Sequence, residues 1–156
     1  GRDECLARLR AARARLARVL KPGGRLVLIE VDNTTFGFDP PSAVIGEWWE
    51  GFNSFQREAG GDPEVGRKLR GFCEELKMNI LAEEIIPAVS SRGHPDQRED
   101  LMAYVENLLL SGADSLIETG RIDRAGVERL QTEFGRIRAR PDQHVQYEAV
   151  RVIAQV

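Results

Sequence analysis

The sequence predicts an α/β fold in which apolar strands are joined by amphipathic helices. The first observation is the segment 16–32, LARVLKPGGRLVLIEVD, which has the pattern of a helix end, a glycine turn and an apolar strand. The run 26–31 is apolar except for Glu30, which is typical of a strand covered on both faces in a parallel sheet. Two further strands are expected at 80–90 and from 144 onward. With 156 residues, the chain is expected to form a single domain, 1–156.

The helices of the first half are predicted from apolar spacing and from turn residues. A helix is expected over 3–20, and it ends where Lys21 precedes Pro22. The polar, Gly- and Pro-rich stretch DNTTFGFDPPS is expected to be a loop, followed by an aromatic-rich helix over 42–59. In the next helix Asp62 is predicted to cap and Pro63 to occupy the first turn, with an apolar stripe that continues to about residue 77.

The second half is predicted to carry a helical insertion, 91–140, between the last two strands. Pro87 predicts that the strand at 80–90 is an edge strand or is bulged. Asp96 and Glu99 have the spacing of a capping box that opens a helix reaching residue 110. A short helix is expected near 114–119, and Asp123 is predicted to open the last helix.

Composition argues against several function classes. The net charge of −3, with 30% charged residues, offers no basic excess for nucleic acid, and the Arg-rich first helix is interpreted as a solvated face. No apolar run reaches the length of about 18 residues that a membrane span needs, and no signal peptide is expected. Cys5 and Cys73 are far apart, and neither His94 nor His144 has a ligand at metal spacing, so no metal site is predicted. Buried thiols indicate a cytoplasmic protein.

Three segments resemble class I S-adenosylmethionine-dependent methyltransferases of the small-molecule branch. Residues 16–32 are similar to the segment that ends in the family's fifth strand, and GFNSFQREAGGDPEVGRKLRGFCEELKM, residues 51–78, is similar to the segment after that strand. The last strand resembles the seventh, which inserts antiparallel between strands five and six. The resemblance implies a partial Rossmann-like methyltransferase sheet, strands five to seven, with flanking and inserted helices. It also implies methyl transfer from S-adenosylmethionine to a small-molecule acceptor.

The half of the family's domain that binds the methyl donor has no counterpart in this sequence. In the family a glycine-rich loop after the first strand approaches the cofactor, but here Gly23-Gly24 precede a strand, while Gly60-Gly61 and Gly112 come after helices. No residue of this chain is therefore predicted to bind the cofactor, and S-adenosylmethionine is not expected to bind to this chain alone. The chain is expected to be the carboxyl-terminal half of such a domain and inactive alone, whether as a fragment, as a truncated reading frame, as a product whose amino half was lost or as a protein completed by another chain.

Six residues are candidates for a substrate pocket, and each has a structural alternative. Glu30 and Asp32 lie at the carboxyl end of the first strand, where they would orient substrate or act as a base, or else cap the loop. Arg67 would meet an acidic substrate group or pair with a nearby glutamate. The aromatic residues would line a pocket or pack in the core, and two adjacent tryptophans cannot both face one core. These aromatic candidates are Trp48, Trp49 and Phe52.

A second functional hypothesis is not enzymatic. The chain would be a substrate-side or oligomerisation module, completed by a homodimer partner or another chain at the exposed edge of its first strand. A third hypothesis, an unrelated α/β binding domain, requires the motif resemblance to be a coincidence.

Overall fold

The computed structural model describes residues 11, 15 and 20–155. The helix predicted over 3–20 lies almost entirely outside the described residues, of which Ala11 and Arg15 are helical. Cys5 also lies outside them.

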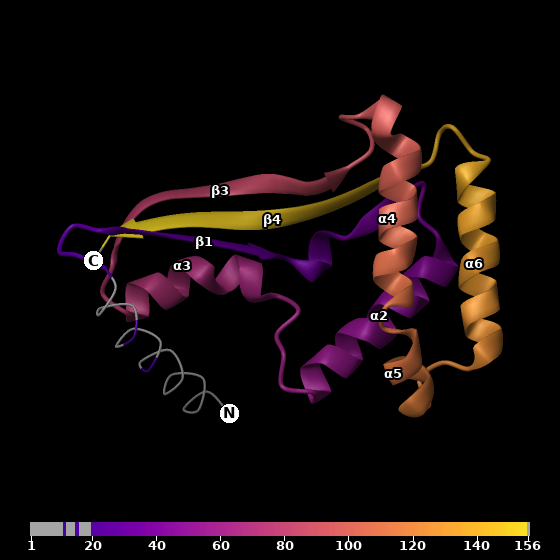
Figure 1. Ribbon diagram of the computed structural model, residues 1–156, viewed down its shortest axis with the longest axis horizontal. Coiled ribbons are helices and arrows are strands. Elements are labelled where there is room, and N and C mark those ends of the chain that lie inside the picture. Colours follow the sequence, from indigo (N-terminus) through magenta and orange to yellow (C-terminus); the bar gives the residue numbers. More distant parts are fainter. Residues whose placement is uncertain (1–10, 12–14, 16–19, 156) are drawn as a thin grey trace. The chain divides into compact units, whose positions relative to one another are not determined.

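The described chain is a mixed α/β structure with a four-stranded antiparallel sheet (Figure 1). The strands are β1 (Arg25–Val31), β2 (Gly37–Asp39), β3 (Asn79–Ser90) and β4 (His144–Gln155). The α-helices are α2 (Ala43–Glu58), α3 (Val65–Glu75), α4 (Arg98–Leu110), α5 (Ala113–Glu118) and α6 (Arg124–Arg138). Two short 3-10 helices are η1 (Asn33–Thr35) and η2 (Pro95–Gln97).

The last strand, β4, is the centre of the sheet. Its residues 149–155 pair antiparallel with β1, its residues 144–146 pair antiparallel with β2, and it also pairs with β3. Figure 1 shows the yellow β4 running between β1 and β3. The expected antiparallel insertion of the last strand between the two earlier ones is therefore found. The edge position that Pro87 predicted for its strand is also confirmed, because β3 pairs only with β4 among the described strands.

The prediction that β1 is covered on both faces is wrong. In the described part of the chain β1 pairs with β4 alone, and that pairing is antiparallel. Its side chains alternate, since Leu26 and Leu28 pack against the core under α3, whereas Val27 and Ile29 are each 53% exposed. One face of β1 is covered, and the other carries apolar side chains in solvent.

The chain divides into two compact units. The first unit comprises residues 1–32, 64–86 and 149–156, and the second comprises residues 33–63 and 87–148.

In the first unit, α3 packs against β1 and the carboxyl-terminal part of β4. Gly66 permits this contact, because a Cβ atom at that position would lie 2.7 Å from the carbonyl oxygens of Glu30 and Val31. Burial raises the pKa of the Cys73 thiol in this core. The buried members of the core are Leu69, Cys73, Leu76, Met78, Val150, Val152 and Ala154.

The predicted start of α3 is wrong by about two residues. The helix begins at Val65 with Glu64 at the N-cap, and the Glu64 side chain makes no capping hydrogen bond. Asp62 and Pro63 precede the helix, and the Pro63 carbonyl accepts a hydrogen bond from the Asn33 N–H at 2.9 Å. The DP pair thus belongs to the connection before the helix.

In the second unit, α2 packs against α5 and α6, and α4 packs against α6. The predicted cap of α6 is confirmed, since the Asp123 carboxylate accepts a hydrogen bond from the Gly126 N–H at 2.7 Å. The predicted capping box of Asp96 and Glu99 is wrong, because residues 95–97 form η2 and α4 begins at Arg98 without a side-chain cap. The buried apolar residues on α4, α5 and α6 are Met102, Val105, Leu109, Leu116, Leu130, Phe134 and Ile137.

The segment predicted as a loop, residues 32–42, contains η1 and β2. Phe38 of β2 is buried and pairs with Val145 of β4. The stretch FGFD thereby extends the sheet and brings two phenylalanines next to α2.

Candidate functional site

Asn33 in the second unit holds the aromatic side chains of a candidate site in place. Its side-chain oxygen accepts a hydrogen bond from the Tyr147 hydroxyl at 2.5 Å, and its side-chain N–H donates to Asn53 at 2.7 Å. Its carbonyl oxygen accepts the indole N–H of Trp49 at 2.8 Å. Asn33 is 5% exposed, so this polar network is buried and fixes the Trp49 and Tyr147 rings.

The rings next to this network form one continuous aromatic cluster. Phe36 lies 4.3 Å from Trp49 and 5.5 Å from Tyr147, measured between ring centroids. Phe52 stacks on Trp49 at 5.5 Å with an interplanar angle of 16°. Phe38 meets Phe36 edge to face at 6.0 Å. Such pairs rigidify a surface that can receive a flat apolar molecule.

A cavity of about 210 Å³ lies against this cluster, and we call it the β2–α2 pocket. It is larger than an engineered apolar cavity of about 150 Å³ that binds benzene. Gly46 leaves space at the pocket, because a Cβ atom added there meets nothing within 4 Å. The pocket is lined from β2 and the residue before it by Phe36, Gly37 and Phe38, and from α2 and its amino-terminal approach by Pro41, Ser42, Ile45, Gly46 and Trp49.

Ser42 places a hydroxyl in the lining of this pocket. It is the N-cap of α2, and its Oγ accepts a hydrogen bond from the Ile45 N–H at 3.4 Å. The same hydroxyl donates to Oε1 of Glu133 at 2.7 Å. Glu133 is 7% exposed and also receives a hydrogen bond from Arg136 at 3.0 Å. The hydroxyl in the pocket lining is therefore hydrogen-bonded to a buried carboxylate.

The six predicted site residues divide between the two units. Trp49 lines the β2–α2 pocket, and Phe52 supports it from behind. Trp48 is buried elsewhere in the second unit, where its indole N–H donates to the Leu109 carbonyl at 3.2 Å and its ring lines a separate cavity of about 140 Å³. The two adjacent tryptophans are both buried, each against different neighbours.

The remaining candidates, Glu30, Asp32 and Arg67, lie in the first unit. Asp32 is 5% exposed, and its Oδ2 lies 2.7 Å from Nη2 of Arg67 and accepts the Arg67 Nε–H at 2.8 Å. The hydrogen bond to Asp32 raises the pKa of Arg67. These two side chains tie the start of α3 to the end of β1, while the Glu30 side chain is exposed. Their geometry is that of a structural ion pair.

Sequence reasoning missed Phe36, Phe38, Ser42 and Glu133. Phe36 and Phe38 lie in a stretch rich in Gly and Pro, which predicted a loop. Their F-x-F spacing is nevertheless that of side chains on one face of a strand. The hydrogen bond from Ser42 to Glu133 joins residues 91 positions apart, so no local sequence pattern predicts it.

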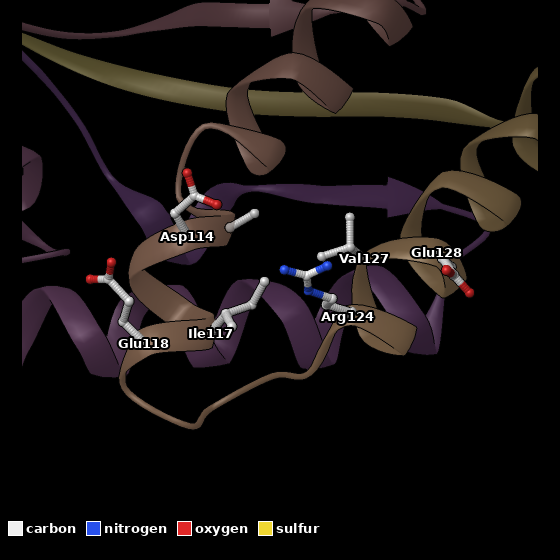
Figure 2. A pocket seen from close by; sticks show the side chains of 7 residues that line it. Asp114, Ile117, Glu118, Arg124, Val127 and Glu128 are labelled. Atoms are coloured by element: carbon white, nitrogen blue, oxygen red, sulfur yellow. The ribbon is translucent and has the colours of Figure 1, made fainter.

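A wider cleft of about 450 Å³ lies between α5 and α6. Figure 2 shows Ile117 of α5 and the Arg124 guanidinium of α6 pointing toward one another beside Val127, while the carboxylates of Glu118 and Glu128 point away from that space. None of the predicted site residues lines it.

Neither a metal centre nor a membrane span is found within residues 20–155 and the two described residues before them. No group of three or more His, Cys, Asp or Glu side chains there is arranged to hold a metal ion. No helix there has the length and apolar character to cross a bilayer.

No protein-family model matches the chain, and no curated protein matches it in sequence.

Proposed function

We propose that this chain is the acceptor-binding part of an S-adenosylmethionine-dependent methyltransferase that acts on a small molecule. The observation that carries the proposal is the position of β4, which pairs antiparallel with β1 and also pairs with β3. The resemblance implies this arrangement for strands five, seven and six of the class I fold. On this proposal the sheet is the corresponding part of a Rossmann-like methyltransferase sheet.

The β2–α2 pocket is the proposed site of the methyl acceptor. Its lining contains no charged side chain, and its walls are aromatic on two sides through Phe36, Phe38 and Trp49. This lining suits a small aromatic or apolar molecule. Since the sulfonium of the donor is already activated, methyl transfer relies mainly on positioning, which rigid aromatic walls supply.

The methyl donor is proposed to be held by residues outside this chain or by another chain. The carboxyl end of β1 leads into η1 at Asn33. The glycine pair Gly23-Gly24 precedes β1, and the pair Gly60-Gly61 lies between α2 and α3. None of these places is the glycine loop between a strand and a helix that approaches a nucleotide cofactor. We place the protein in the cytoplasm, where a thiol such as Cys73 stays reduced.

The test is methyl transfer from tritium-labelled S-adenosylmethionine to a panel of small phenols, catalysed by the complete natural polypeptide that contains these residues. Gly46→Leu fills the β2–α2 pocket and is expected to reduce transfer at least tenfold. Gly51→Leu is the matched control, because it lies on the same helix, outside the pocket lining, and an added Cβ atom also meets nothing within 4 Å. Failure of the polypeptide to bind the donor, or equal transfer by the two variants, would contradict the proposal.

A second candidate function is that of an assembly module completed by a second copy or another chain. It is favoured by β1, whose second edge is unpaired among the described strands and whose Val27 and Ile29 side chains are exposed. Ile153 pairs with Val27 across the sheet and so shares that apolar face. Sedimentation velocity should show association at micromolar concentration that is lost in the double variant Val27→Lys, Ile29→Lys. A monomeric wild-type chain would refute this candidate.

A further inference from the structure

The β2–α2 pocket has a single hydrogen-bonding side chain that is open to a ligand. Ser42 and Trp49 are the two lining residues whose side chains carry polar atoms. The indole N–H of Trp49 is already donated to the Asn33 carbonyl at 2.8 Å. An indole has no other polar group. The hydrogen-bonding character of the pocket's side chains therefore depends on the Ser42 hydroxyl.

Glu133 determines which way that hydroxyl points. An ionised carboxylate can only accept hydrogen bonds, so the 2.7 Å contact between Ser42 Oγ and Glu133 Oε1 places the hydroxyl proton on the side of Glu133. Arg136 donates to the same carboxylate at 3.0 Å, so the Glu133 oxygens act as acceptors toward both neighbours. The proton of Ser42 is thus directed to Glu133 and is not offered to a ligand.

The oxygen of Ser42 retains capacity to accept. A hydroxyl oxygen has two lone pairs. One of them faces the Ile45 N–H at 3.4 Å, a long contact that belongs to the N-cap of α2. The other is available to the pocket, whose remaining lining side chains are apolar. A ligand that donates a hydrogen bond can bond to this lone pair of Ser42. A ligand that carries only an acceptor would place its own lone pair against that of Ser42 and form no hydrogen bond.

We infer that the β2–α2 pocket selects an aromatic ligand that carries one hydrogen-bond donor, a phenolic hydroxyl or a ring N–H, and that Ser42 receives that donor. This inference rests on the proposed function, because it names the class of methyl acceptor. It also distinguishes substrate from product. In methyl transfer the acceptor oxygen bonds the methyl carbon, the S–CH3 bond of the sulfonium breaks to leave a neutral thioether, and the hydroxyl proton passes to solvent. The resulting ether cannot donate to Ser42, so the product binds more weakly than the substrate.

The experiment compares two probes of similar shape, 2-naphthol and 2-methoxynaphthalene, by calorimetric titration of this chain without a methyl donor. The wild-type chain is expected to bind 2-naphthol about tenfold more tightly, the ratio that one well-placed hydrogen bond provides. Ser42→Gly keeps an acceptable N-cap residue and removes the hydroxyl, so the ratio should fall below about threefold. Glu133→Met keeps a side chain of similar length but removes the oxygen that accepts the Ser42 proton, which leaves that proton free to rotate, so the ratio should also fall.

Ser54→Gly is the control, because it removes a hydroxyl from α2 at a half-buried position outside the pocket lining, where the hydroxyl donates to Glu58. It should retain the wild-type ratio. Equal affinities of the two probes for the wild-type chain, or a ratio that survives in Ser42→Gly, would overturn the inference while leaving the pocket as an acceptor site. Absence of binding by both probes would overturn the inference and the proposed acceptor site together.

Discussion

Replacement of Gly66 by alanine tests the docking of α3 on β1. The added Cβ atom would lie 2.7 Å from two backbone oxygens, those of Glu30 and Val31, about 0.7 Å short of the 3.4 Å at which ordinary contact begins. Both obstacles are backbone atoms of a strand, so α3 itself must move away. Overpacking of this kind costs about 1–3 kcal/mol, which the higher helix propensity of alanine offsets in part. We expect a net loss of about 1–2 kcal/mol in the free energy of unfolding.

Thermal and urea unfolding measure this effect directly. For a chain of this size the expected loss corresponds to a fall of about 2–8 °C in Tm. Gly71→Ala in the same helix is the control, because its added Cβ atom meets nothing within 4 Å. That variant should gain up to about 1 kcal/mol from helix propensity alone. Equal stability of Gly66→Ala and Gly71→Ala would show that α3 docks on β1 without need of a glycine at position 66.

Three further predictions concern the charged and thiol groups. Arg67→Met removes the guanidinium that pairs with the buried Asp32 carboxylate and should lower the free energy of unfolding by about 1–3 kcal/mol, with partial recovery on adding Asp32→Asn; an unchanged urea midpoint would contradict the ion pair. Arg121 lowers the pKa of Glu58, so the stabilisation is present above the ordinary pKa near 4.5 and is lost as pH falls through the folded value. The variant Glu58→Gln should therefore not show this decrease in stability when unfolding is measured at decreasing pH. Burial raises the pKa of Cys73, so stability should decline as pH rises above the ordinary value near 9.0, and Cys73→Ala should remove that alkaline decline.

Local signals in the sequence were sufficient to predict most of the elements. The 3.6-residue spacing of apolar residues located α2 and α6, and the Asp123 cap was predicted correctly because capping depends on residues within one turn. The strands β3 and β4 were also located, and the antiparallel position of β4 was expected from the resemblance.

Pairing and packing between distant residues could not be predicted from local patterns. An apolar run does not specify how many faces are covered, so β1 was expected to be covered on both faces although four of its seven residues are exposed. β2 has three residues, too few to show a strand period, and its Gly- and Pro-rich surroundings favoured a loop. The site depends on contacts such as that between Asn33 and Tyr147, which are 114 positions apart.

The central claim is that these residues hold the acceptor site of a methyltransferase but not its donor site. Nuclear magnetic resonance of the isotope-labelled chain, titrated first with 2-naphthol and then with S-adenosylmethionine, tests both parts in one measurement. We expect 2-naphthol to shift the amide signals of Gly37, Ile45 and Gly46, and S-adenosylmethionine to shift no signal. Saturable shifts caused by S-adenosylmethionine, or naphthol shifts that cluster instead around Ile117 and Val127, would contradict the central claim.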